Sequence, residues 1–116
     1  MAERRMISRK VILTDNYYKL TDKAKLLYFY LILEADDDGF VGNIRNAICA
    51  AGANIRTLVQ LAEYNYVIYF PSGVIAITHW KMQNRIEKRM CTPTIYTREY
   101  EQLSVDGNGV YNYRTL

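Results

Sequence analysis

The stretch from Asn43 to Trp80 constrains the fold most, because it contains two short amphipathic helices followed at once by a hairpin. Both predicted helices repeat apolar residues at i, i+3 or i+4, and i+7, the spacing of one helix face. Asn43 and Asn54 are well suited to cap the two helices, and Gly52 can end the first in a left-handed conformation. The apolar faces are predicted to be Ile44, Ala47, Ile48 and Ala51, and Ile55, Leu58, Val59 and Ala62.

A hairpin is predicted directly after the second helix. Two β-rich runs, 66–70 and 74–78, flank the turn Pro71-Ser72-Gly73, and a short loop that ends in glycine is common in hairpins. A further short strand is expected near 40–42. The sequence therefore predicts an α+β fold that is mainly helical, namely a winged helix-turn-helix with a small antiparallel sheet.

A central helix is predicted from Asp22 to about Glu34, with Thr21 as its N-cap. Apolar residues occur on nearly all of its sides, so several other elements must cover it. Two interpretations stay open at this point. Either the whole apolar surface belongs to the core, or one face is also a contact between subunits.

Three aspartates and a glycine, Asp36-Asp37-Asp38-Gly39, follow this helix. The segment lacks the alternating ligands and the final glutamate of a calcium loop. A tight turn is expected instead, with Gly39 at positive φ and the carboxylates bonded to backbone amides or to basic neighbours. His79 has no partner at a metal-ligand spacing, and Trp80 is expected to close one end of the core. No cofactor and no metal site are predicted.

The net charge is only +3, but the basic residues are concentrated in residues 1–10 and 81–91. Such clusters are candidates for contacts with nucleic-acid phosphates. The alternative is an ordinary solvated surface with internal ion pairs. The phosphate-contact candidates, including one on the first short helix, are Arg4, Arg5, Arg9, Lys10, Arg45, Lys81, Arg85, Lys88 and Arg89.

The second short helix carries the candidates for reading base edges: Asn54, Arg56, Thr57 and Gln60. In a helix-turn-helix this helix enters the major groove, where arginine suits guanine and asparagine or glutamine suits adenine. Glu63 is unfavourable near DNA, and the hairpin tip has no lysine or arginine. Use of the same helices for protein contacts is therefore the alternative.

Chemistry for catalysis is not recognisable. The sequence has no glycine-rich phosphate loop and no nucleophile placed beside a base, so binding is favoured over an enzymatic role. No run approaches the ~20 apolar residues of a membrane span. The basic start lacks the apolar run of a secretory signal. A cytoplasmic protein without membrane partners is expected, with Cys49 and Cys91 as free thiols.

Several segments together resemble the N-terminal domain of phage replisome organisers, which are DnaD-like replication initiation proteins. The segments are residues 1–10, Leu26-Leu27-Tyr28-Phe29, Ala35 to Val41, Ser72-Gly73-Val74 and Ile77-Thr78-His79-Trp80. The resemblance covers about residues 1–100. It implies a winged-helix fold, binding of origin DNA in the cytoplasm of a bacterial host, self-association, and recruitment of helicase-loading proteins.

The resemblance also implies a domain boundary. Residues 1–100 are expected to form the winged-helix domain, and residues 101–116 an extension or a linker toward a domain that this chain lacks. Double-stranded DNA is the expected ligand, with single strands open as an alternative. A primosome scaffold that reads no bases, or a small transcriptional regulator, are the alternative functions.

Overall fold

The computed structural model describes residues 4–114 of the 116-residue chain. It is an α+β structure in which helices and a small antiparallel sheet share one core. In chain order the elements are α1 (Arg9–Ile12), α2 (Asp15–Tyr18), α3 (Asp22–Glu34), β1 (Phe40–Val41), α4 (Ile44–Ala51), α5 (Ile55–Glu63), β2 (Val67–Tyr69), β3 (Ile75–Ile77), α6 (Trp80–Gln83), the 3₁₀ helix η1 (Lys88–Met90), α7 (Thr97–Glu101), β4 (Leu103–Val105) and β5 (Tyr111–Tyr113).

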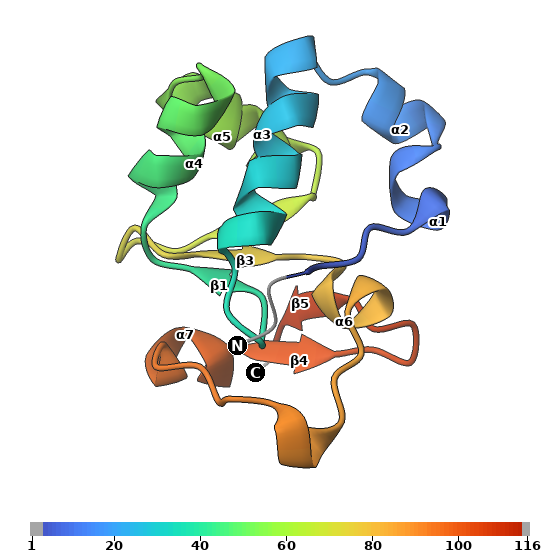
Figure 1. Cartoon of the computed structure of the whole chain (residues 1–116), viewed down its shortest axis with the longest axis vertical. Helices are drawn as coiled ribbons and strands as arrows, with labels where there is room; N and C mark the ends of the chain where they lie inside the picture. The colour runs from blue at the N-terminus through green and yellow to red at the C-terminus, as the bar shows by residue number, and fades with distance from the viewer. Residues whose placement is uncertain (1–3, 115–116) are drawn as a thin grey trace.

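Helix α3 is the centre of the helical layer, with α4 and α5 on one side and α1 and α2 on the other (Figure 1). Its bounds agree with the prediction, because the Thr21 hydroxyl caps it by accepting from the amide of Ala24. Leu27, Tyr28, Leu31 and Ile32 are fully buried. Leu26 and Leu33 stay 41% and 60% exposed, so this chain does not cover every side of the helix.

The three strands form an antiparallel sheet in the order β1-β3-β2, which lies beneath the helices in Figure 1. Phe40 is opposite Ala76, and Ile68 is opposite the same residue on the other side. The strands lie within the predicted ranges 40–42, 66–70 and 74–78. Gly73 takes φ +90° in the turn, and its amide donates to the Phe70 carbonyl, as expected for a short loop that ends in glycine.

Helix α4 buries the predicted face, but the predicted face of α5 is partly wrong. Leu58 and Leu61 are fully buried, whereas Ile55 and Val59 are 49% and 40% exposed. The buried stripe is therefore rotated toward Leu61. The reason is tertiary, since the neighbouring α3 and the start of β2 approach α5 from that side, and the Tyr66 amide donates to the Leu61 carbonyl.

A second layer closes the opposite face of the sheet. The β4–β5 hairpin lies beneath the three-stranded sheet (Figure 1) and pairs Leu103 with Tyr113. Leu103 and Tyr111 are each 1% exposed and belong to the same core as α3. Tyr111 donates its amide to the Thr78 carbonyl and its hydroxyl to the Asp38 carbonyl, both at 2.7 Å. Residues 103–113, expected as an extension or linker, therefore pack into this core.

The turn after α3 connects distant parts of the chain. Asp36 accepts from the hydroxyl of Thr94, Asp37 from the amide of Thr92, and Asp38 from the amide of Thr94. Trp80 lies beside this turn, is fully buried, and donates its indole N–H to the Asp37 carbonyl. The prediction that these carboxylates bond backbone amides is confirmed, as is the burial of Trp80.

Across residues 4–114, every helix is too short or too polar to cross a bilayer.

Candidate nucleic-acid interface

The surface formed by α4 and α5 holds the base-reading candidates, and its local geometry follows from the sequence. Gly52 ends α4 at φ +65°, and the Ala53 amide donates to the Ile48 carbonyl, which turns the chain sharply into α5. Asn54 then starts α5 with a capping box, in which its Oδ1 accepts from the Thr57 amide at 3.2 Å. The two helices are thereby held in a fixed relation.

Asn54, Arg56, Thr57 and Gln60 all line one shallow hollow on the outer side of α5. Three of these side chains also make internal bonds. The Thr57 hydroxyl lies 3.4 Å from both the backbone nitrogen and the side-chain Oδ1 of Asn54. Gln60 Oε1 accepts from the hydroxyl of Thr21 at 3.0 Å. Arg56 is exposed and forms no ion pair with any of residues 4–114.

A further cation, absent from the candidates predicted from the sequence, lies at the C-terminal end of α4. Lys23 of α3 donates through Nζ to the Ala51 carbonyl at 3.4 Å, so its charge is at the C-terminus of α4. Arg45 is exposed on α4, and Asn46 beside it bonds Glu34. The residue spacing within α4 and α5 does not predict this position of Lys23, because it results from the packing of α3 against α4.

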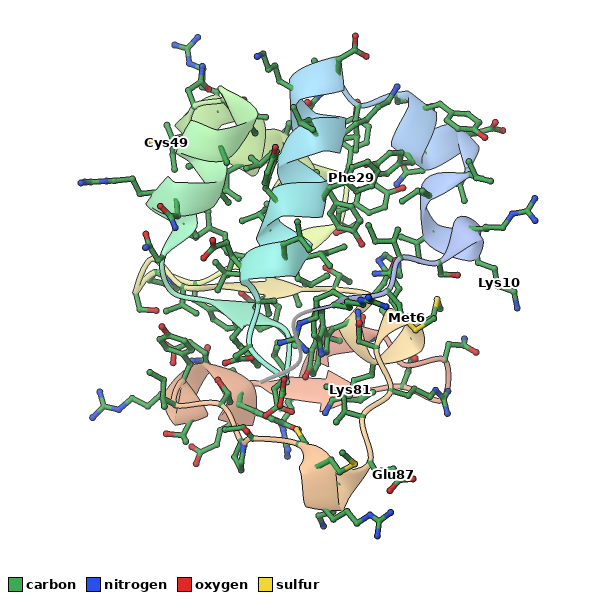
Figure 2. The ribbon with its side chains drawn as sticks, in the orientation of Figure 1. Met6, Lys10, Phe29, Cys49, Lys81 and Glu87 are labelled. Atoms are coloured by element: carbon green, nitrogen blue, oxygen red, sulfur yellow. The ribbon has the colours of Figure 1, made fainter. Side chains whose placement is uncertain are left out.

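Two phosphate-contact candidates are used inside the protein instead. The Arg5 side chain is 3% exposed, and its guanidinium lies 3.0 Å from Asp37 Oδ1, donates to the Ala35 carbonyl and stacks on the Trp80 ring. Lys81 is 32% exposed and lies 3.0 Å from Asp38 Oδ1. Figure 2 shows Lys81 directed toward the interior rather than outward. The Arg5 guanidinium is thus enclosed by the protein, whereas the partly exposed Lys81 stays a candidate for phosphate contact.

These buried pairs shift the pKa values of their members. The backbone hydrogen bond from Thr92, together with the hydrogen bond and charge of Arg5, lowers the pKa of the Asp37 carboxyl. Burial alone would lower the pKa of Lys81, but its hydrogen bond with Asp38 and the charge of that carboxylate leave the pKa raised. The Asp37 carboxyl and the Lys81 ammonium therefore remain ionised at neutral pH.

The remaining basic candidates lie apart from α5. Arg9 and Lys10 are exposed on α1, and Lys10 projects away from the body of the molecule (Figure 2). Arg85, Lys88 and Arg89 are exposed in and before η1, at the end of the molecule opposite α4 and α5 (Figure 1). Arg89 also pairs with Glu87 at 2.8 Å. Arg4 is exposed at the edge of the described chain.

The hairpin tip has its own internal bond, since the Ser72 hydroxyl donates to Glu99 of α7 at 2.7 Å. Residues 69–73 of the tip contain no lysine or arginine, whereas α7 carries Arg98. In residues 4–114, moreover, no three His, Cys, Asp or Glu side chains gather as metal ligands would.

Comparisons with protein-family models, with curated proteins and with solved structures found no match to this chain.

Proposed function

We propose that this chain is a winged-helix protein that binds duplex DNA through α5 and acts at a phage replication origin. Support for the winged-helix assignment comes from the element order α3-β1-α4-α5-β2-β3 and from the sheet order β1-β3-β2. The replication role, self-association and recruitment of helicase-loading proteins rest on the resemblance of the sequence motifs to replisome organisers.

The observation that carries DNA binding is the exposed Arg56, which pairs with no acidic residue of 4–114 and lies beside the polar side chains of one hollow. In the major groove an arginine binds the O6 and N7 atoms of guanine through two hydrogen bonds. Arg45 and Lys23 lie on the adjoining surface and supply phosphate contacts.

The internal bonds of this face favour one kind of base edge. The amide oxygens of Asn54 and Gln60 accept from Thr57 and Thr21, so their NH₂ groups remain as donors. An amide that reads adenine with two bonds needs its oxygen as well as its nitrogen. The face of α5 therefore presents mainly donors, and we expect it to prefer the acceptor-rich edge of guanine.

The test begins with selection of bound duplexes from a random pool, followed by fluorescence-anisotropy titration at several salt concentrations. We expect guanine in the selected sites and a salt-sensitive affinity. Arg56→Ala should weaken binding by about 10- to 100-fold, as loss of a bidentate base contact costs about 1–3 kcal/mol. Arg89→Ala, a change of the same residue type at the opposite end, should have little effect. Absence of salt-sensitive binding to any duplex or single strand rules out the proposal.

A second candidate function is favoured by the exposed apolar residues. Ile55 and Val59 are one helical turn apart on α5, and Leu33 is 60% exposed on α3. Such residues suit a protein contact, as in a primosome scaffold that self-associates without reading bases. Sedimentation of the wild type and of an Ile55→Ser, Val59→Ser double variant distinguishes the two. If the protein is a scaffold, the double variant should lose the self-association of the wild type. A wild type that stays strictly monomeric at high concentration excludes the scaffold.

A transcriptional regulator would use the same surface. Placement of the selected sites at a replication origin or at a promoter separates it from an initiator.

A further inference from the structure

A hollow of about 770 Å³ lies on the side of the molecule away from α4, between two strand edges. Strand β2 forms one wall and β5 forms another, while α1, α2 and the end of α5 complete the rim. We call it the β2–β5 groove. None of the DNA-contact candidates on α5 lines it, and Lys10 is the one phosphate-contact candidate at its rim.

The β2 wall presents unpaired backbone groups. In the β2–β3 pair, the Phe70 amide donates to Val74 and the Thr78 amide donates to Tyr66. Hydrogen-bonded pairs alternate in an antiparallel ladder, so Val67 and Tyr69 point their N–H and C=O groups away from β3. Because β2 is an edge strand, these four groups have no hydrogen-bond partner in residues 4–114.

The same alternation exposes the edge of β5. The Asp106 amide donates to Val110 and the Arg114 amide to Gln102, so Tyr111 and Tyr113 direct their backbone groups away from β4. On this side of β5, the Tyr111 amide donates to the Thr78 carbonyl. The N–H and C=O of Tyr113 are left without a partner within the described chain.

Two side chains at the groove carry polar atoms that are buried and unsatisfied. Thr78 is 6% exposed, and neither its Oγ1 nor Nδ1 of His79 has a hydrogen-bond partner within residues 4–114. A buried polar atom without a partner destabilises the folded protein. Burial lowers the pKa of His79, against the opposing charge of Asp106, so its ring is neutral at pH 7 and can donate or accept.

The rest of the groove suits an extended chain. Its walls carry aromatic rings, among them Tyr64, Tyr69 and Tyr113, and among residues 4–114 Lys10 is the single charged residue that lines it. We propose that the β2–β5 groove binds an extended peptide of a partner protein, which pairs with β2 as an added strand. Its side chains are apolar at alternate positions, and a carboxylate near one end meets Lys10.

Hydrogen-bond complementarity supports a peptide rather than a compact ligand. Outward groups on Val67 and Tyr69 repeat every second residue, and a paired strand presents its own donors and acceptors at that interval. A small molecule would satisfy one or two of these groups but would not reproduce their spacing.

The first experiment identifies peptides and tests their binding mode. A library of random ten-residue peptides displayed on phage is selected against the full chain. Enriched sequences are then synthesised with single N-methyl groups at each position. N-methylation should abolish binding at every second residue, because only alternate amides face β2, and should have little effect at the residues between. Equal sensitivity at all positions, or at none, overturns the proposal.

Matched variants place the peptide on the β2 edge. Tyr69→Pro removes the outward N–H without touching the bonds to β3, and proline is tolerated where an edge N–H faces solvent. Tyr69→Ala removes the same ring but keeps the N–H. We expect Tyr69→Pro to weaken peptide binding at least 10-fold more than Tyr69→Ala. Equal affinities for the two variants contradict strand addition.

Failure to enrich any peptide, combined with self-association that Tyr69→Pro abolishes, assigns the groove to a second copy of this chain instead.

Discussion

At the scale of single residues, the aspartate turn holds the two ends of the chain against the core. The Arg5–Asp37 pair lies beside Trp80, and Asp36 and Asp38 accept from the loop that follows η1. Removal of one partner from a buried ion pair strongly destabilises the folded protein, because the other charge stays buried and unpaired. These residues therefore contribute to stability and not to DNA contact.

The first prediction concerns the dependence of stability on pH. Asp37→Asn should lower the free energy of unfolding by about 3 kcal/mol at pH 7. The pKa of Asp37 is lowered in the folded protein, so its contribution is present above the usual value of about 4 and is lost as pH falls through the folded pKa. The difference between wild type and variant should therefore shrink below about pH 4. Urea titrations across pH measure it.

Glu87→Gln is the matched control for this prediction. It breaks the exposed Arg89 pair and should cost less than about 1 kcal/mol at any pH. A gap between wild type and Asp37→Asn that stays constant to low pH contradicts the assigned role of the Asp37 charge.

The second prediction compares two glycines with nearly equal backbone angles. Gly39 and Gly73 have φ of +87° and +90°. A Cβ on Gly39 would lie 2.4 Å from the Trp80 ring, whereas one on Gly73 would meet nothing within 4 Å. Gly73→Ala should cost about 1–3 kcal/mol from backbone strain alone. Gly39→Ala should cost clearly more, as measured by urea unfolding, and equal costs contradict the close approach of Trp80.

At the scale of helices and strands, the sequence predicts the features that neighbouring residues determine, such as helix caps and turn conformations. Thr21 and Asn54 cap their helices as expected, and Gly52 and Gly73 take the positive φ that their turns require. The face of α5 is only partly predictable, since Leu58 lies inside as expected but Val59 lies outside. With several apolar residues on neighbouring sides, the spacing alone does not decide which stripe is covered.

A third prediction tests the observed orientation of α5. Leu61→Ala should cost about 2–5 kcal/mol of stability because a fully buried side chain leaves a cavity. Val59→Ala should cost less than about 1 kcal/mol because the side chain is already 40% exposed. Thermal unfolding of the two variants measures the difference, and the reverse order contradicts the orientation of the helix.

At the scale of the whole molecule, the C-terminal hairpin shares the core of the helical layer. The segment 104–109 reads as a turn, but nothing in it indicates that Tyr111 reaches the Asp38 carbonyl. Likewise, the basic residues in 1–10 and 81–91 suggest one phosphate-binding surface. Tertiary packing instead pairs Arg5 and Lys81 internally and places η1 opposite α5. Such long-range pairings are not encoded in any local pattern.

A fourth prediction follows from the shared core. Tyr111→Ala should cost about 3–5 kcal/mol, as for other large buried aromatic residues. In hydrogen exchange, the variant should lose amide protection in α3 as much as in β4 and β5, because one core unfolds cooperatively. Protection of α3 that is unchanged in the variant contradicts a single folding unit.

The central claim is that α5 and its neighbours form the DNA-binding surface, and amide chemical shifts test it most directly. The full chain, labelled with ¹⁵N, is titrated with the selected duplex at low salt. We expect the largest shifts in residues 44–63 and at Lys23, with the amide shifts of η1 unchanged. Shifts that cluster around η1 or α1, or no shifts at any DNA concentration, would contradict it.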